Sequence, residues 1–245
     1  MQDLQAAAER WSLSLGEPYE QGAAGYTTRA EFADGTPVVL KLVHPHRESE
    51  HEADALRAWD GDGAIRLLGQ DGDMLLLERC EPGTPLSSVG QDAALDVLIG
   101  LLPRLWMPPA ESFHTLVDEA RWWYPKLPRT SLGEAAREAI DTLAETQGEP
   151  VLLHQDLHGD NVLAAEREPW LVIDPKPLAG EREFAVAPIV RSRELGEARR
   201  DVLYRFDRLT SELGLDRERA RGWTVAQTVA WSSGAWHDRV AEWLL

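Results

Sequence analysis

The stretch that decides the fold is HQDLHGDN, His154 to Asn161, followed at a short distance by IDPK, Ile173 to Lys176. Short apolar runs adjoin these stretches at Val151–Leu153, Val162–Ala164 and Trp170–Ile173. Runs of this length between polar turn residues are typical of small buried strands. The pattern therefore predicts two polar loops, each held at the end of a buried strand.

Three oxygen-bearing side chains in these loops follow the order found in kinases. Phosphoryl transfer from a nucleotide needs one group that accepts the proton of the acceptor hydroxyl and two oxygen ligands for the metal. We expect Asp156 to be that base, and Asn161 and Asp174 to bind Mg²⁺, a hard ion that prefers oxygen donors. Asp and Asn also occur in loops because they cap turns, so the ordered set with its strands is what indicates a catalytic site.

Two histidines in the same loop suggest an alternative, a zinc site. His154 and His158 stand four residues apart, but Gly159 follows them and the segment is typical of a loop. Cys80 is the chain's single cysteine, so no set of thiolate ligands for zinc exists. We predict that His154 is a buried structural residue that hydrogen-bonds the loop backbone.

A lysine lies inside an apolar strand farther upstream. Residues 37–42 read PVVLKL, and Lys41 is one of only three lysines in a chain that otherwise uses arginine. A compact ammonium group on a flexible stem suits the α- and β-phosphates of a nucleotide. A lysine that snorkels from an edge strand would give the same pattern.

A glutamate at the start of the next helix is expected to pair with this lysine and orient it. Residues 53–59 form a helical pattern, and Glu48 and Glu52 precede it. We choose Glu52 because it lies four residues before Leu56, one turn from the apolar contacts that would bury this helix face. Glu48 is the alternative.

A loop with glycines precedes the lysine strand. Gly22 and Gly25 come just before a strand pair that the hairpin signal Asp34-Gly35 joins. Because glycine has no side chain, the backbone at Gly22 and Gly25 can approach nucleotide phosphates closely. An ordinary turn would have the same composition.

An apolar strand that ends at a Pro-Gly break is the expected hinge between two lobes. Residues 74–77 are apolar, and Glu78, Arg79 and Cys80 follow them. We expect the backbone of these three residues to read the adenine edge of the nucleotide. A strand followed by a turn, without a ligand, is equally compatible with this segment in isolation.

Together these residues resemble the aminoglycoside phosphotransferase superfamily, and within it the streptomycin 6-kinase and hydroxyurea phosphotransferase family. The resemblance covers most of the chain. The segments that carry it are VLKL (39–42), HEADALR (51–57), AIRLL (64–68), LLLERCEPG (75–83), HQDLHGDN (154–161) and IDPKPLAGE (173–181). The Asp-Pro-Lys-x-x-x-Gly-Glu ending is more specific to this branch than the Asp–Asn pair.

The resemblance implies an α+β, bilobal protein-kinase-like fold. A small N-terminal lobe with an antiparallel sheet, residues 1–80, is expected to bind the nucleotide. A larger and mainly helical C-terminal lobe, residues 81–245, is expected to carry catalysis and to bind the acceptor. The resemblance further implies ATP and Mg²⁺ as cofactors, with transfer of the γ-phosphoryl group to a hydroxyl of a small molecule.

Three departures from the family pattern stand out. Ala185 occupies a place where family members commonly carry an acidic residue that helps to brace the catalytic loop. Trp106 occupies a place where histidine is frequent. The chain is also shorter than is usual in the family. Because Asp174, and not position 185, is expected to carry the metal, the resemblance still implies an active enzyme.

The charge of the chain disfavours one class of partner. The formal net charge is −17 and the sequence pI is about 4.8. This charge argues against nucleic acid as a partner, because its phosphates would be repelled. A polycationic acceptor steered into an acidic cleft is compatible with this charge, although acids spread along the whole chain also serve solubility.

Cysteine content and hydropathy favour a cytoplasmic enzyme. A single cysteine fits a reducing compartment. Residues 1–11 carry charges and lack the apolar core of a signal peptide. The longest apolar stretch, residues 93–106, is interrupted by Asp96 and Pro103, so we expect no membrane span. The oligomeric state remains unknown.

Helical periodicity accounts for most of the remaining chain. The apolar positions 4, 7, 8, 11 and 15 predict an N-terminal helix, and those between 95 and 105 predict another. Ser131-Leu132-Gly133-Glu134 is a capping-box signature for a helix that runs to about Gln147. From Ala187 onward we predict helices with a break near Gly214.

Aromatic residues offer a further hint about the acceptor. Four of the ten tryptophans lie near the C-terminus, at 223, 231, 236 and 243. We expect them to fill the core between helices, although aromatic rings also suit the face of a sugar. The segment RWWY, residues 121–124, is a candidate for part of an acceptor pocket.

Three hypotheses about function follow. The leading one is an ATP-dependent kinase that acts on an aminoglycoside such as streptomycin. The first alternative is another acceptor: hydroxyurea, an amino sugar or another metabolite. The second is a non-catalytic nucleotide-binding module, which Ala185 favours but Lys41, Asp156, Asn161 and Asp174 oppose.

Overall fold

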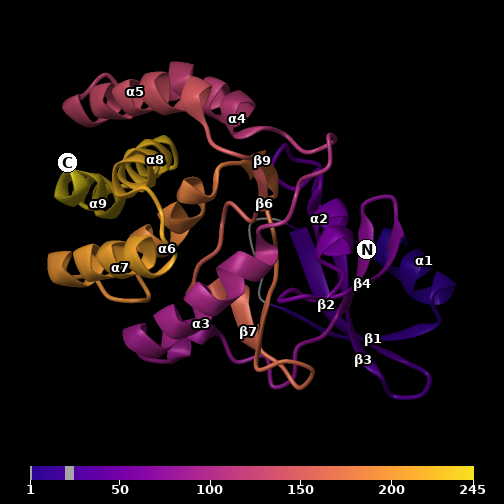
Figure 1. The fold of residues 1–245 in the computed structure, drawn as a ribbon. Coiled ribbons are helices and arrows are strands. Elements are labelled where there is room, and N and C mark those ends of the chain that lie inside the picture. The colour runs from indigo at the N-terminus through magenta and orange to yellow at the C-terminus, as the bar shows by residue number, and fades with distance from the viewer. Residues whose placement is uncertain (1, 20–24) are drawn as a thin grey trace. The chain divides into compact units, whose positions relative to one another are not determined.

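The fold is that of a computed structural model (Figure 1), which describes residues 2–19 and 25–245. The chain forms two compact units. The first comprises Met1–Thr84 and Leu163–Lys176, and the second comprises Pro85–Val162 and Pro177–Leu245. The chain therefore leaves the first unit after residue 84 and returns to it for residues 163–176.

The first unit is built on an antiparallel sheet of five strands in the spatial order β1-β2-β3-β5-β4. The strands are β1 (Leu13–Pro18), β2 (Gly25–Phe32), β3 (Pro37–Val43), β4 (Leu67–Asp71) and β5 (Met74–Glu78). The predicted hairpin is confirmed, because β2 and β3 pair without interruption from Gly25↔Val43 to Glu31↔Pro37. Since β3 pairs with β5 on its other side, Lys41 lies on a central strand and does not snorkel from an edge.

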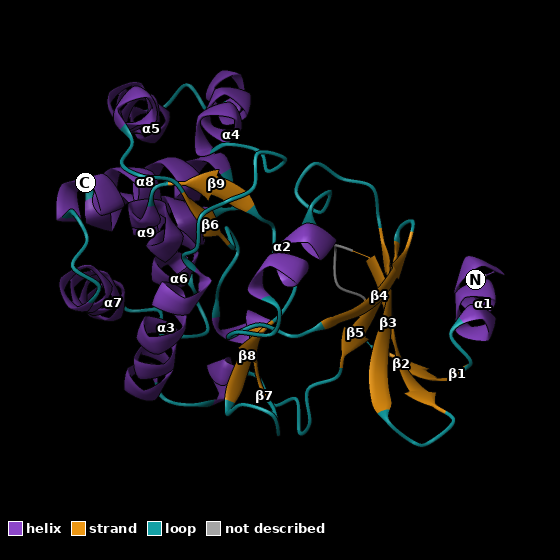
Figure 2. Ribbon diagram, turned by 45° about the vertical axis from the view of Figure 1, so that its right-hand side comes forward, coloured by secondary structure: helices purple, strands orange, loops and turns teal. Residues whose placement is uncertain are grey.

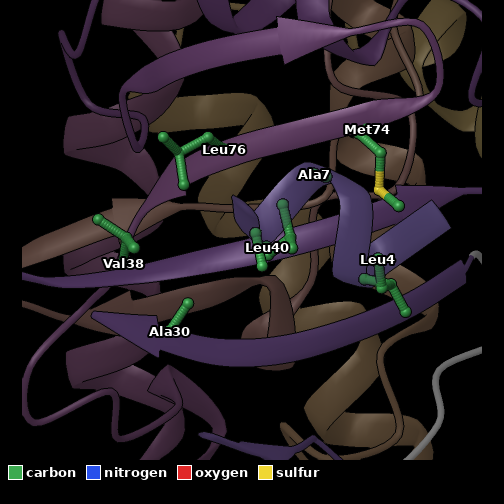
Figure 3. Packing of buried hydrophobic residues seen from close by; sticks show 8 residues of the cluster. Leu4, Ala7, Ala30, Val38, Leu40, Met74 and Leu76 are labelled. Atoms are coloured by element: carbon green, nitrogen blue, oxygen red, sulfur yellow. The ribbon is translucent and has the colours of Figure 1, made fainter. Parts of the chain in front are cut away.

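Two helices of the first unit, α1 (Gln2–Arg10) and α2 (Glu52–Trp59), lie on opposite faces of this sheet (Figure 2). On the α1 face a cluster of apolar side chains is buried (Figure 3): Leu4, Ala7, Ala8, Ala30, Val38, Leu40, Met74 and Leu76. Because side chains alternate along a strand, Lys41 points to the face opposite Leu40, where α2 lies. The predicted N-terminal helix is confirmed but is shorter than expected, since Leu15 belongs to β1.

A two-stranded sheet of β7 (Val162–Ala164) and β8 (Trp170–Val172) brings the chain back to the first unit. Val172 donates its amide to Gly63 O (2.9 Å) and accepts from the amide of Ile65 (3.1 Å). Between the strands, Arg167 donates two hydrogen bonds to the Glu78 carboxylate, at 2.8 and 2.9 Å. Asp174, two residues after β8, is thereby tied to the unit that contains Lys41.

The second unit is mainly helical. Its helices are α3 (Gln91–Leu105), α4 (Leu116–Trp123), α5 (Ser131–Leu143), α6 (Ala187–Arg191), α7 (Arg199–Glu212), α8 (Arg217–Ala230) and α9 (Ala235–Leu244). Two short strands, β6 (Val151–Leu153) and β9 (Leu178–Gly180), pair antiparallel. The short 3₁₀ turns are η1 (Leu86–Ser88), η2 (Tyr124–Lys126), η3 (Ala144–Thr146), η4 (Gly159–Asn161) and η5 (Arg182–Val186). The predicted break near Gly214 is confirmed, between α7 and α8.

Helix α8 forms the centre of the second unit's core. All of its residues from 223 to 229 are buried. The ring of Phe184 lies between those of Trp123 and Trp223, with centroid distances of 6.0 and 5.8 Å. Trp223 therefore fills the core as predicted. Among the described residues, no helix is long and apolar enough to cross a membrane.

The Gly-Glu ending of the IDPKPLAGE motif has a structural role. Glu181 is 1% exposed and accepts two hydrogen bonds from Arg219 of α8, at 2.9 and 2.8 Å. Gly180 packs so closely on α4 that a Cβ there would lie 2.6 Å from the Cβ of Leu116. The motif thus joins α4, β9 and α8, and a side chain at position 180 would disturb this junction.

The capping prediction for α5 is wrong by one residue. Thr130, not Ser131, is the N-cap, and its side chain accepts a hydrogen bond from the amide of Gly133 at 3.3 Å. Thr130 has an extended backbone, and its carbonyl accepts the first helical hydrogen bond from Glu134, so Ser131 is already helical. The helix also ends earlier, at Leu143, and continues as the turn η3.

Candidate active site

The loop after β6 is closed by its own hydrogen bonds. The amide of Asp156 donates to His154 O at 2.8 Å, and Asn161 Nδ2 donates to Asp156 O at 2.9 Å. Gln155 has a φ of 62°, in the left-handed region that residues other than glycine rarely adopt. Leu157 is 1% exposed and anchors the loop in the core. The predicted burial of His154 is confirmed at 3% exposure.

An arginine that the sequence did not single out lies beside the candidate base. Arg191, the last residue of α6, places Nη2 3.6 Å from Asp156 Oδ1. The side chains of Arg191 and Asp156 are only 8% and 15% exposed. Nothing in the local pattern around residue 191 indicates this contact, because it joins segments that are distant in the chain.

A second ion pair lies at the other end of the loop. His158 Nδ1 is 3.3 Å from Glu194 Oε1, and the same oxygen accepts the amide of Gly159 at 3.0 Å. Burial alone would lower the pKa of His158, but the hydrogen bond to Glu194 raises it above its ordinary value. Burial would raise the pKa of Glu194, but the contact with His158 lowers it to about 2. This pair fixes η4 to the segment that follows α6.

A pocket of about 290 Å³ lies beside Asp156 within the second unit. Six of the residues that line it are Asp156, His158, Arg191, Glu194, Trp231 and Trp236. The Arg191 guanidinium lies over the Trp231 ring, 4.7 Å from its centroid. Trp231 and Trp236 thus form part of a pocket wall, which corrects for these two residues the prediction that the C-terminal tryptophans fill the core.

The segment RWWY does not contribute to this pocket. Trp123 is 1% exposed and donates its indole N–H to the Glu119 carboxylate at 3.0 Å. Tyr124 donates its hydroxyl to Asp141 at 3.0 Å. These contacts give the segment a structural role within the α4–α5 region.

In the first unit, Lys41 is held between two carboxylates. Its Nζ donates to both oxygens of Glu52, at 2.7 and 2.8 Å, and to Asp174 Oδ1. The predicted pairing with Glu52, rather than with Glu48, is confirmed. Lys41 and Glu52 are 5% and 2% exposed. Burial alone would lower the pKa of Lys41, but the two carboxylates raise it above its ordinary value, so the ammonium group keeps its charge.

The two candidate metal ligands have the chemistry that Mg²⁺ requires. Asp174 offers a carboxylate two residues after β8, and its backbone φ is 54°. Asn161 uses its Nδ2 within the loop, so its Oδ1 is the atom suited to ligation. Carboxylate and carboxamide oxygens are hard donors that fit Mg²⁺. The residues present therefore fit the ion, and their role as its ligands stays a prediction.

Several groups of the expected hinge segment already bind other parts of the protein. The Glu78 amide donates to Arg66 O at 2.9 Å, and the Glu78 carboxylate binds Arg167. Arg79 pairs with Glu81 at 2.6 Å. Cys80 is buried, which raises the pKa of its thiol to about 12. Adenine recognition at Glu78, Arg79 and Cys80 stays a prediction, and it concerns backbone groups other than the Glu78 amide.

The two glycines of the predicted phosphate loop differ in what the structure describes. Gly22 lies outside the described residues. Gly25 begins β2 opposite Val43, and a Cβ there would lie 2.3 Å from Leu42 O. The close approach of β3 therefore explains why position 25 is glycine, and the contact of Gly25 with phosphates stays a prediction.

The fold and these side chains define a class of protein: small-molecule kinases with an α+β, protein-kinase-like fold. Similar solved structures include choline kinase LicA from Streptococcus pneumoniae, with a TM-score of 0.68 and 14% identity over 100% of this chain and 99% of that one. Another is aminoglycoside phosphotransferase APH(4)-Ia with AMP-PNP and hygromycin B, with a TM-score of 0.63 and 15% identity over 100% and 95% of the two chains. At these identities the likeness concerns the fold, and the predicted fold class is confirmed.

The chain belongs to the aminoglycoside/hydroxyurea antibiotic resistance kinase family, which matches residues 10–241. It is 45% identical to hydroxyurea phosphotransferase from Kitasatospora aureofaciens, over 90% of this chain and 68% of that protein. It is 41% identical to streptomycin 6-kinase from Streptomyces griseus, over 89% of this chain and 77% of that protein. The predicted family is confirmed, and the chain is a small-molecule phosphotransferase rather than a non-catalytic module.

Proposed function

We propose that this kinase transfers the γ-phosphoryl group of ATP, with Mg²⁺, to a hydroxyl of an aminoglycoside such as streptomycin. The observation that carries the proposal is the closed loop that presents Asp156 at the wall of a pocket lined by tryptophans. A streptomycin kinase at 41% identity supports the choice of acceptor.

Asp156 acts as the base in the proposed reaction. The bond between the γ-phosphorus and the β,γ-bridging oxygen breaks, and a bond between this phosphorus and the acceptor oxygen forms. The acceptor proton passes to the Asp156 carboxylate, and the products are ADP and a phosphate ester. Lys41, oriented by Glu52, binds the α- and β-phosphates.

Asn161 and Asp174 are the proposed ligands of Mg²⁺. The ion, when bound, offsets the negative charge of the nucleotide phosphates. The contact of Lys41 with Asp174 supports a role for Asp174 near phosphate, because the cation that would bind phosphates already lies beside it.

We assign the two activities to different parts of the chain. Residues 1–80 bind the nucleotide, with Gly22 and Gly25 at its phosphates and the backbone of Glu78, Arg79 and Cys80 at its base. Residues 81–245 carry the base and bind the acceptor. The segment 163–176 is the exception, since it belongs by its contacts to the first unit.

Hydroxyurea is a second candidate acceptor, and one feature of the pocket favours it. Both acids that line the pocket, Asp156 and Glu194, lie beside a basic side chain, Arg191 and His158 respectively. Arg193 and His237 also line the pocket, so its wall has no excess of acidic groups and suits a small neutral acceptor better than a polycation. The relative at 45% identity is a hydroxyurea phosphotransferase.

An ATP-consumption screen over streptomycin, other aminoglycosides, amino sugars and hydroxyurea tests the proposal. We expect ADP release that depends on streptomycin, together with a product heavier by one phosphoryl group in mass spectrometry. Hydroxyurea-dependent release without a response to streptomycin would select the second candidate. Acceptor-independent hydrolysis alone would overturn both.

A further inference from the structure

The base Asp156 is attached to a chain of buried polar side chains that the proposed reaction leaves unexplained. Arg191 contacts Asp156 and also donates from Nη1 to Gln227 Oε1 at 2.7 Å. Gln227 lies in α8 and has no exposed surface. A buried guanidinium costs free energy unless it is well paired, so this arrangement calls for a function.

Two tryptophans hold Arg191 from the outside. The ring of Trp231 covers its guanidinium, and Trp236 Nε1 donates to Arg191 O at 2.8 Å. The Arg191 guanidinium is therefore held by Trp231 and Gln227, while Trp236 holds the Arg191 backbone. Since Arg191 Nη2 lies 3.6 Å from Asp156 Oδ1, charge attraction favours carboxylate orientations that keep this oxygen near the guanidinium.

The nitrogen of the same Gln227 carboxamide binds the backbone of the loop that carries Asp156. Its Nε2 donates to Gln155 O at 3.0 Å. Gln155 has the left-handed backbone described above, a conformation that costs roughly 1–3 kcal/mol and persists only where the surroundings enforce it. One carboxamide thus binds both the arginine at the base and the residue that precedes the base.

Position 185 offers no polar group for this task. Ala185 lies in η5 and is 5% exposed, with a methyl group as its side chain. The polar contacts described here reach the loop from α6 and α8 instead.

We propose that Arg191 and Gln227 are positioning residues for the Asp156 base. Arg191 sets the direction of the carboxylate, and Gln227 couples Arg191 to the loop backbone at Gln155. This inference depends on the proposed role of Asp156, and it adds two residues through which that role is exerted.

A double-mutant cycle tests the proposal: Arg191→Met and Asp156→Asn, alone and combined, with Arg191→Lys and Gln227→Met as further variants. We expect Arg191→Met to lower kcat by about 10- to 100-fold, with the KM for ATP changed less than about threefold, because a misdirected base affects the chemical step. Arg191→Lys should recover only part of this loss, because an ammonium lacks the fork that contacts Asp156 and Gln227 together. Gln227→Met should likewise lower kcat while changing the KM for ATP little.

The combined variant separates the possible outcomes. If Arg191 acts through Asp156, Arg191→Met causes no further loss in the Asp156→Asn background. A full and additive loss would overturn the proposal, as would an Arg191→Met enzyme with unchanged kcat. Retained turnover in Asp156→Asn alone would instead refute the proposed base.

Rates are normalised to the number of nucleotide-binding sites, so that unfolded protein does not count. Arg200→Met is the matched control, because the Arg200 side chain is 89% exposed.

Discussion

Charged groups are held in different ways in the lysine cluster of the first unit (Lys41, Glu52 and Asp174) and in the loop of the second unit that carries Asp156. Lys41 and Glu52 come from a strand and the helix that follows it, so they are close in sequence and bind each other directly. Asp156 lies beside Arg191, and Gln227 contacts Arg191 and the backbone of Gln155; both partners come from helices much farther along the chain. The Lys41–Glu52 pair is local, although Lys41 also contacts Asp174, 133 residues farther along the chain. The contacts around Asp156 depend on how the helices of the second unit pack.

The largest expected effect concerns the loop. Asp156→Asn should lower kcat by about 10³-fold, because the carboxamide cannot accept the acceptor proton. The affinity for ATP should stay close to that of the wild type, since the lysine cluster is unchanged. Steady-state kinetics and calorimetric titration with ATP measure the two quantities. An Asp156→Asn enzyme with wild-type turnover would remove this residue from the reaction.

Removal of the lysine should show how strongly the first unit depends on its local pair. Lys41→Met leaves Glu52 buried without its cation, which should lower the free energy of unfolding by about 3–5 kcal/mol. Glu52→Gln should cost less, because Lys41 still contacts Asp174. Urea unfolding of both variants measures the difference, and equal losses would contradict the role of the unpaired carboxylate.

Asp174 contacts Lys41 and is also a proposed ligand of Mg²⁺. Asp174→Ala should weaken Mg²⁺-dependent binding of ATP by at least about 100-fold, because even groups that only orient a metal ligand contribute 10- to 100-fold. Binding of ATP in EDTA serves as the control and should change little. Unchanged affinity with Mg²⁺ present would refute Asp174 as a ligand.

The smallest expected effect concerns the ion pair at the end of the loop. Folding lowers the pKa of Glu194, so its contribution to stability is full above pH 4.5 and is lost as the pH falls toward 2. Folding raises the pKa of His158, so its contribution is full below pH 6.5 and is lost as the pH rises through the higher folded value. Glu194→Gln should therefore destabilise most between pH 4.5 and 6.5, by roughly 1 kcal/mol.

Thermal unfolding of Glu194→Gln from pH 4 to 9 measures this window. The exposed pair formed by Arg193 and Glu197 supplies the control, since Glu197→Gln should leave the melting temperature unchanged. A loss of stability in Glu194→Gln that is the same at every pH would show that Glu194 acts by packing and not by charge.

Much of the first unit could be predicted because its signals are local. The apolar run PVVLKL and the Asp-Gly turn indicated the hairpin, and the spacing of Glu52 from Leu56 indicated the partner of Lys41. Strand β1 was missed because it is an edge strand whose residues are mostly exposed, so it lacks an apolar face.

The second unit shows why the rest of the site could not be predicted. The motif HQDLHGDN marked the loop, but Arg191 and Gln227 lie in helices whose local sequence carries no sign of the loop they contact. Arg167, which ties β7 and β8 to Glu78, stands among other charged residues, so its local sequence does not indicate this contact either. Such contacts arise from tertiary packing, which a single sequence does not display.

The return of residues 163–176 to the first unit has a consequence for biosynthesis. Chains fold in large part as they emerge from the ribosome, N-terminal regions first. A nascent chain that has reached residue 84 contains the five-stranded sheet but not Arg167, β8 or Asp174. The unit begun first on the ribosome is thus completed only after the segment with the HQDLHGDN loop has been translated.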